Sequence, residues 1–300
     1  MKISRFGVVS IVVVAIVAAA AWYFRPRTED APSTPVQDAS NPTFVGSAPQ
    51  ASKSPALTPV TPAPPIRHPV QAIEQNQPES AVAKVRSLPT LEESDPRLKE
   101  DLGTLLGRKK VEQFFLLDNF VRRVVSTVDN LGRDHAPPMM WPVHPSPGRF
   151  STLPRSDGEI INPDNGQRYS ALVQFIETVN PRQVVQLYVS LYPLFQQAYV
   201  EMGYPQGYFN DRLIAVIDQL LATPIVEEPL HVALVNVKGP YQSERPWTRY
   251  EFVDEKLESL SAGQKILLRT GPTNHRRLRA KLVEYRNLLT KAAMPAAAKQ

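Results

Sequence analysis

The chain has 300 residues, no cysteine, and 34 basic against 29 acidic side chains, which give a pI near 9.3. Without cysteine it has no disulfide framework, no thiolate metal ligand and no cysteine nucleophile. The net charge of +5 does not indicate nucleic-acid binding, because residues 88–300 carry 26 basic and 24 acidic side chains, and we expect no nucleic-acid partner.

The first element is a predicted transmembrane helix. Residues 7–24 carry no charge and are long enough to cross a hydrocarbon core as a helix. Trp22, Tyr23 and Phe24 end this stretch, as aromatic side chains do at a membrane interface. The alternative is a cleaved signal peptide, because the small residues 18–21 suit a peptidase. We expect a membrane anchor with residues 1–6 on the cytoplasmic side and the remaining chain on the other side.

The second element is a predicted disordered linker over residues 25–87. It holds 12 of the 30 prolines and shows no sustained apolar period, so it cannot bury enough surface to offset its ordering entropy. We expect a passive spacer with polyproline II character. The alternative is a docking site for a partner, although no PxxP motif with flanking specificity residues stands out.

Residues 88–292 are expected to form one globular domain, followed by a disordered tail over 293–300. A first helix should start at Ser94 or Asp95, because Pro96 suits the first helical position. Apolar residues at helical spacing predict a second helix over 110–131. The proline-rich residues 134–167 predict a loop with a small hairpin.

Helical spacing resumes over 169–179 and 182–202, and Pro193 predicts a kink or two abutting helices in the latter. Residues 230–253 favour a second hairpin. Further helices are expected over 208–224, 254–260, 261–271 and 274–292, with Ser261 and Gln264 forming a capping box. The sequence therefore predicts a mainly α fold: a helical bundle-like globular domain with one or two small β-hairpins.

The stretch FVRRVVSTVDNL, residues 120–131, joins an apolar helical stripe to polar side chains. At helical spacing Asp118, Arg122 and Asp129 lie within about 40° of one another. Asp118 and Arg122 can form an i,i+4 ion pair. Asp129 opposes the helix dipole, so it and Asn130 could hydrogen-bond the next loop or receive an arginine such as Arg168. Structural bridging, a polar ligand pocket and catalysis remain open here.

Tyrosine is concentrated at positions 188, 192, 199, 204 and 208. The helical spacing of these tyrosines predicts that they lie in the core or at its edge. The alternative is that their rings line a saccharide groove. Glu201 and Asp211 lie near this cluster and could act as an acid and a base on a glycan, although nothing in their spacing makes them converge.

The five histidines show no metal-ligand spacing, and the chain has no GxSxG, Walker A or GxGxxG motif, so we expect no metal and no cofactor. The final helix, 274–291, is basic and amphipathic. It could face anionic lipid, a cell-wall polymer or nucleic acid, or simply the acidic remainder of the same domain.

Six stretches spread over 88–290 together resemble a bacterial family, domain of unknown function 3014. They are LPTLEESDPRL (88–98), FVRRVVSTVDNL (120–131), RY (168–169), YPLFQQAYVEMGYP (192–205), DRLIAVIDQLLATP (211–224) and YEFVDEKLESLSAGQKILLRTGPTN (250–274). The resemblance implies a Gram-negative envelope protein with an N-terminal membrane segment and a proline-rich connector. It implies no activity, cofactor or catalytic residue.

These observations predict a non-enzymatic binding or scaffolding domain, tethered to the bacterial inner membrane by a single span, with the C-terminal domain in the periplasm. The expected partner, besides the membrane, is an envelope protein or the cell wall. The expected contact surface comprises Arg122, Asp129, Asn130, Arg168, Tyr169, Arg269 and Asn274. The alternative is a hydrolase or lyase acting on an envelope glycan through Glu201 or Asp211.

Overall fold

The computed structural model describes residues 64–70, 88–235 and 246–292. The predicted transmembrane helix (7–24), most of the predicted linker (25–87) and the predicted tail (293–300) lie outside the described residues. None of the helices within the described ranges is long and apolar enough to cross a membrane.

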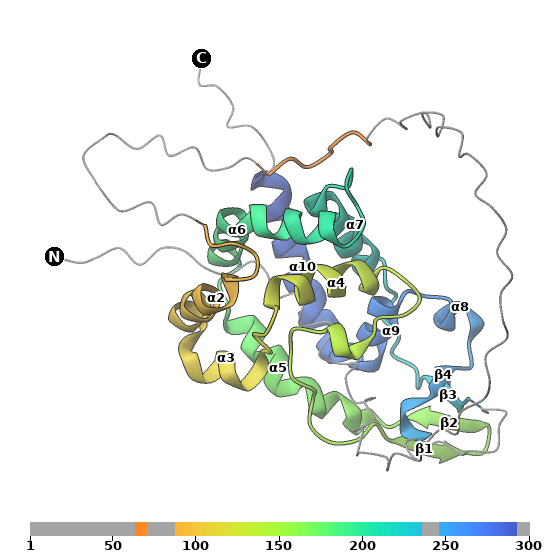
Figure 1. The fold of residues 1–300 in the computed structure, drawn as a ribbon. Coiled ribbons are helices and arrows are strands. Elements are labelled where there is room, and N and C mark those ends of the chain that lie inside the picture. Colours follow the sequence, from red (N-terminus) through yellow and green to blue (C-terminus); the bar gives the residue numbers. More distant parts are fainter. Residues whose placement is uncertain (1–63, 71–87, 236–245, 293–300) are drawn as a thin grey trace, which may run out of the picture.

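The described chain is mainly helical, as the sequence predicted (Figure 1). Its helices are α2 (Ser94–Leu102), α3 (Arg108–Phe114), α4 (Phe120–Leu131), α5 (Gln167–Thr178), α6 (Pro181–Glu201), α7 (Phe209–Leu221), α8 (Glu255–Glu258), α9 (Ala262–Arg269) and α10 (Pro272–Ala292). A π-helical segment, η2 (Gly103–Gly107), joins α2 to α3. Short 3₁₀ turns are η3 (Pro138–Met140), η4 (Pro163–Gly166) and η5 (Pro246–Thr248).

The core lies between α4, α6, α7 and α10. Helix α10 packs against α5, α6 and α7, while α4 packs against α6 and α7. Among the fully buried side chains of this core are Phe120, Tyr188, Phe195, Phe209 and Tyr285. Burial of each such side chain stabilises the fold by about 1.5–3 kcal/mol relative to exposure. The predicted place of the tyrosines is confirmed, because Tyr188, Tyr192 and Tyr199 are buried and Tyr204 and Tyr208 lie at the core edge.

The single helix predicted over 110–131 is wrong, because the chain breaks between α3 and α4. Phe115 is extended and bridges Val143, and Asn119 has a left-handed φ of 52°. The Asp95 carboxylate accepts hydrogen bonds from the backbone N–H groups of Asn119 (2.6 Å) and Phe120 (3.1 Å). A carboxylate from another helix therefore fixes the start of α4, and a local apolar period cannot predict this.

Helix α6 runs without interruption through Pro193, so the predicted pair of abutting helices is wrong. Asn180 caps its first turn, with its side-chain oxygen accepting from the backbone N–H of Arg182 at 3.0 Å. Leu191, Tyr192, Leu194 and Phe195 are buried around the exposed Pro193. Packing of these neighbours outweighs the one backbone hydrogen bond that the proline removes.

The two predicted hairpins join into one antiparallel sheet, with strand order β1-β2-β3-β4. Its strands are β1 (Thr152–Arg155), β2 (Gly158–Ile161), β3 (His231–Leu234) and β4 (Tyr250–Phe252). Glu159 pairs with Val232 across the join, and Val232 packs with Phe252 and Leu268 in a small apolar cluster. The sheet lies at one end of the helical body (Figure 1).

Candidate functional site

A segment from within the predicted linker, residues 64–70, lies against the start of α7 and bends at Arg67 and His68 (orange in Figure 1). The carboxylate of Asp211 accepts two consecutive backbone hydrogen bonds from it, from the N–H of Arg67 at 2.8 Å and from the N–H of His68 at 2.7 Å. Charge-assisted hydrogen bonds of this kind are about twice as strong as neutral ones. The prediction of a linker disordered over residues 25–87 does not include this contact.

Two neighbouring side chains complete the contact. The Tyr208 hydroxyl accepts from the backbone N–H of Val70 at 2.5 Å. The Asn210 amide donates to the backbone carbonyl of His68 at 2.8 Å. Three backbone donors and one backbone acceptor of the segment are therefore satisfied by side chains at the start of α7.

These side chains are held in place by the helices beneath them. Asp211 lies in the first turn of α7, where the helix dipole favours a carboxylate. Asn210 is fully buried, and its side-chain oxygen accepts from the Tyr188 hydroxyl at 3.1 Å, which directs the amide nitrogen toward the segment. The Tyr208 ring packs 5.4 Å from the ring of Tyr192 on α6.

Side-chain burial in the segment is small. Only His68 and Val70 are half-buried, and the other five residues are exposed. Val70 packs against the main core, whereas the side chain of Ile66 is 55% exposed. The site therefore holds the segment mainly through its backbone.

A cavity of about 400 Å³ lies beside the docked segment. We define the α7 groove as the surface of the helical body that holds the segment through Tyr208, Asn210 and Asp211 and continues along the cavity with Tyr199, Arg212, Ala215 and Asp218. Pro64 and Pro65 of the segment form its other wall.

Asp129 holds Arg212, one of the residues of the α7 groove. Its carboxylate contacts Arg212 at 2.8 Å and Arg133 at 2.6 Å, and Tyr204 donates to it at 3.2 Å. The side chain of Asp129 is only 6% exposed. The predicted arginine partner was Arg168, but these contacts come from Arg133 and Arg212, so Asp129 ties α4 to α7.

The other predicted site residues on α4, Arg122 and Asn130, lie at or near the surface. Arg122 pairs with Glu92 at 2.7 Å and with Glu201 at 2.9 Å, and not with Asp118, which lies before the first residue of α4. Hydrogen bonds from Gln197 and then Arg122 lower the pKa of Glu201. The Asn130 amide donates to the Ser126 hydroxyl at 3.3 Å.

The other predicted site residues form a second group near the sheet. Arg168 donates to the carbonyl of Pro147 at 3.0 Å and lies over the ring of Tyr169, whose pKa is raised by burial. Arg269 donates to the Tyr250 carbonyl at 3.0 Å. Asn274 donates to the Gly166 carbonyl at 2.8 Å.

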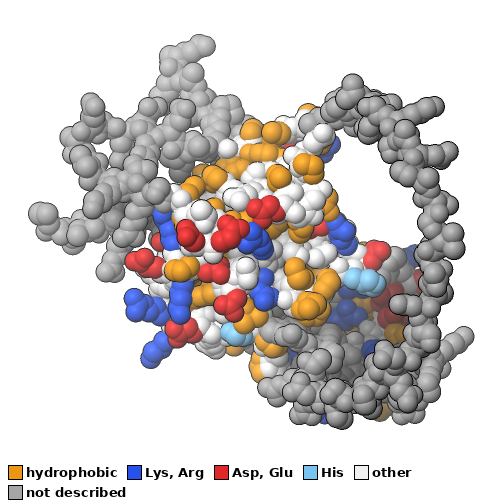
Figure 2. Space-filling model, in the orientation of Figure 1, with side chains coloured by type: hydrophobic (Ala, Val, Ile, Leu, Met, Phe, Trp, Pro, Cys, Tyr) orange, Lys and Arg blue, Asp and Glu red, His pale blue; other side chains and the backbone are white. Residues whose placement is uncertain are grey.

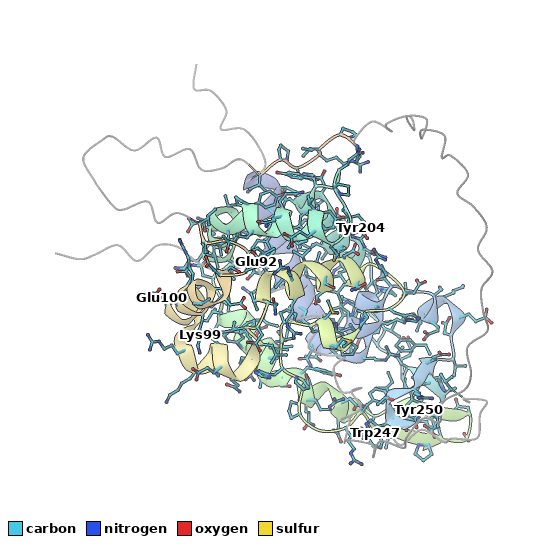
Figure 3. All side chains as sticks on the ribbon, viewed as in Figure 1. Glu92, Lys99, Glu100, Tyr204, Trp247 and Tyr250 are labelled. Atoms are coloured by element: carbon cyan, nitrogen blue, oxygen red, sulfur yellow. The ribbon has the colours of Figure 1, made fainter. Side chains whose placement is uncertain are left out.

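The two groups lie at separate places in the molecule. Tyr204, which contacts Asp129, lies beside α4 and α7, whereas Tyr250, which contacts Arg269, lies at the sheet (Figure 3). Arg269 and Asn274 line a second cavity of about 470 Å³ between β2, the loop 226–230 and the start of α10. The predicted single contact surface is thus divided between two regions.

The two carboxylates considered for catalysis, Asp211 and Glu201, contact different parts of the molecule. Asp211 holds the docked segment, and Glu201 at the end of α6 pairs with Arg122. The described residues contain no group of three or more His, Cys, Asp or Glu that could hold a metal ion. On α10, Arg277 pairs with Glu177 and Arg286 pairs with Asp218, so part of the basic helix is neutralised within the domain.

The sequence singled out Asp211 and Tyr208, but for a glycan and not for a peptide backbone, and it did not single out Asn210. Nothing local marks an asparagine that binds a segment about 140 residues upstream. The linker itself carries no signal for residues 64–70 either, because longer proline-free stretches such as 70–77 occur in it.

The comparisons with known proteins bear on the family alone. A family model described as "Protein of unknown function (DUF3014)" matches residues 120–286. No curated protein and no solved structure matches the chain. The matched range includes Asp129 and the whole start of α7, and it ends on α10.

Proposed function

Because the chain belongs to the DUF3014 family of proteins of unknown function, we propose a function from its own residues: a membrane-tethered, non-enzymatic binding or scaffolding domain of the bacterial envelope. The observation that carries the proposal is the docked segment 64–70. The start of α7 offers a carboxylate, a hydroxyl and an amide to the backbone of this segment, and main-chain hydrogen bonds of this kind can hold a peptide whatever most of its side chains are.

The contacts of the carboxylates favour binding over hydrolysis of a glycan. A glycosidase needs two carboxyl groups flanking one bond, about 5–10 Å apart. The carboxylate of Asp211 is engaged by backbone N–H groups, and Glu201 is not among the residues that line the groove beside Asp211. A hydrolase or lyase therefore has less support than a binding domain.

The charge distribution favours a protein or cell-wall partner over nucleic acid. On the face drawn in Figure 2, acidic and basic side chains are interspersed. The ion pairs Arg122–Glu92 and Arg122–Glu201 belong to this mixed surface. A nucleic-acid site would instead present a continuous basic stripe.

The membrane part of the proposal is tested with the full-length chain in cells. A C-terminal epitope should sediment with the inner membrane, resist protease in intact cells and become sensitive once the outer membrane is opened. A soluble full-length chain, or an epitope that stays protected until the inner membrane is lysed, would contradict the proposed topology.

The binding part is tested by photocrosslinking from the α7 groove in cells. A photoreactive residue replaces Ala215, which is exposed and lines the groove, and a matched variant carries it at Met139 on η3, which is 60% exposed. We expect adducts with an envelope protein or a wall fragment from position 215 and few from 139. Equal labelling from both positions, or none from 215, would overturn the proposal.

A further inference from the structure

Resting on the proposed function, we propose that the α7 groove recognises a segment of a partner protein that bends at two consecutive non-proline residues and continues with a proline and an apolar residue. The chain's own residues 67–70, Arg-His-Pro-Val, have this pattern and occupy the site in the absence of the partner. The groove is thus a peptide-recognition site with a competitor built into the same chain.

The requirement for two non-proline residues follows from the Asp211 carboxylate. Its two oxygens each accept one N–H, at 2.8 Å from Arg67 and at 2.7 Å from His68. Proline at either place removes the donor and leaves a carboxylate oxygen without its hydrogen bond. Side-chain identity at the first of these positions is free, because Arg67 is exposed.

The proline at the third position follows from the backbone geometry. Pro69 has no N–H, and the hydrogen bonds of the segment pass from the carbonyl of His68 to the N–H of Val70 without using its position. Proline also restricts the conformations of the residue before it, so His68 has less freedom to lose when Asp211 and Asn210 bind its backbone. A proline here reduces the ordering entropy lost on binding.

The fourth position requires both an N–H and an apolar side chain. Val70 donates to the Tyr208 hydroxyl, and its side chain packs on the main core. The order of donors and acceptor along the segment also fixes its direction, because the carbonyl of His68 must meet Asn210 while the N–H of Val70 meets Tyr208.

Exchange with a partner is possible because few side chains of the segment are buried. Its hold on the groove comes from four backbone hydrogen bonds and two half-buried side chains. Its advantage is the effective concentration that attachment to the same chain provides. A partner segment with the same pattern makes the same contacts and displaces it when its own local concentration is high.

The test uses the full-length chain in nanodiscs and a fluorescent peptide with the sequence of residues 61–72, TPAPPIRHPVQA. In one chain variant, Arg67→Pro with His68→Pro removes both N–H groups that the Asp211 carboxylate accepts, so the segment should leave the groove. We expect the peptide to bind this variant at least about tenfold more tightly than the unaltered chain, because its competitor is gone.

Peptide analogues then examine the pattern itself. N-methylation at the position of Arg67 or His68 should weaken binding to the emptied groove by about tenfold, whereas N-methylation at Ile66 should change it by less than about twofold. In the emptied chain, Asp211→Asn should weaken binding as strongly, and the matched Glu201→Gln should not. Equal losses at positions 66 and 68, or no binding to the emptied groove, would overturn the inference.

The two proposals fail in different ways. If position 215 yields partner adducts in cells but the peptide does not bind the emptied groove, the binding domain stands and this ligand class is wrong. If the peptide binds but no cellular partner is captured, the peptide chemistry stands and the envelope partner is wrong.

Discussion

His275 shows what burial does to a single titratable group. It is 1% exposed at the start of α10, and its Nε2 has no hydrogen-bond partner among the described residues. Burial, with a smaller contribution from Arg279, lowers its pKa from 6.5 to about 4. The neutral imidazole is therefore the form that the folded domain accommodates.

The stability of the domain should fall in mild acid because of His275. The unfolded chain binds a proton below pH 6.5 and the folded chain only near pH 4. The contribution is thus fully present above pH 6.5 and is lost as the pH falls toward 4, up to about 3 kcal/mol. Denaturant melts between pH 4 and 7 measure this slope. His275→Leu should flatten it, and an unchanged slope would contradict this role.

Asp129 should matter more to stability than a surface carboxylate. Its side chain is 6% exposed and contacts both Arg133 and Arg212, so Asp129→Asn should lower the free energy of unfolding by about 2 kcal/mol. Asp218 is the matched control, because its side chain is 44% exposed and pairs only at the surface with Arg286. Asp218→Asn should cost less than about 1 kcal/mol. Equal losses in urea melts would contradict the buried role.

At the scale of elements, the close approach of α9 to α4 and α7 depends on one small residue. A Cβ atom placed on Gly263 would lie 2.6 Å from a methyl of Leu220 and 3.0 Å from the carbonyl oxygen of Leu131. The capping box of Ser261 and Gln264, which the sequence predicted, fixes where α9 begins. Helix start and helix contact are thus set within four residues, 261–264.

Gly263→Ala should therefore lower the free energy of unfolding by about 1–3 kcal/mol, because backbone at Leu131 cannot yield as a side chain can. Gly103→Ala is the control. Its Cβ would meet only the flexible side chain of Arg108, and its backbone is already right-handed helical. That change should be neutral or stabilising by up to about 1 kcal/mol. Thermal melts of both variants would decide, and equal effects would contradict the packing argument.

At the scale of the whole molecule, the docked segment joins two regions that the sequence separated. Residues 64–70 belong by composition to the linker, yet their backbone is bonded to Tyr208, Asn210 and Asp211. In Figure 1 the segment runs along the end of the molecule where α6 and α7 lie, away from the sheet. The α7 groove and residues 64–70 therefore form one structural unit.

Asp211→Asn should release this segment without unfolding the domain. The amide hydrogens of Arg67 and His68 should exchange several-fold faster, because a neutral amide group replaces one carboxylate oxygen with a donor. The free energy of unfolding should change by less than about 1 kcal/mol. Hydrogen exchange read by mass spectrometry measures both, with Glu201→Gln as control. Unchanged exchange at 67–68 would show that Asp211 does not hold the segment.

The sequence by itself determined the features that depend on neighbouring residues. Helical spacing gave the mainly α class, and the Ser261 capping box and the buried tyrosines of α6 followed from local pattern. The DUF3014 family was also recognisable, because short motifs carry it. These features are local, so they can be read from consecutive residues.

Only the tertiary structure decided the contacts between distant residues. Asp95 fixes the start of α4 by accepting from the N–H of Asn119, and Arg212 rather than Arg168 reaches Asp129. Asp211 meets Arg67 across 144 positions of sequence. A carboxylate can accept a hydrogen bond from any donor that folding brings within about 3 Å, and residue type and spacing do not specify which donor that is.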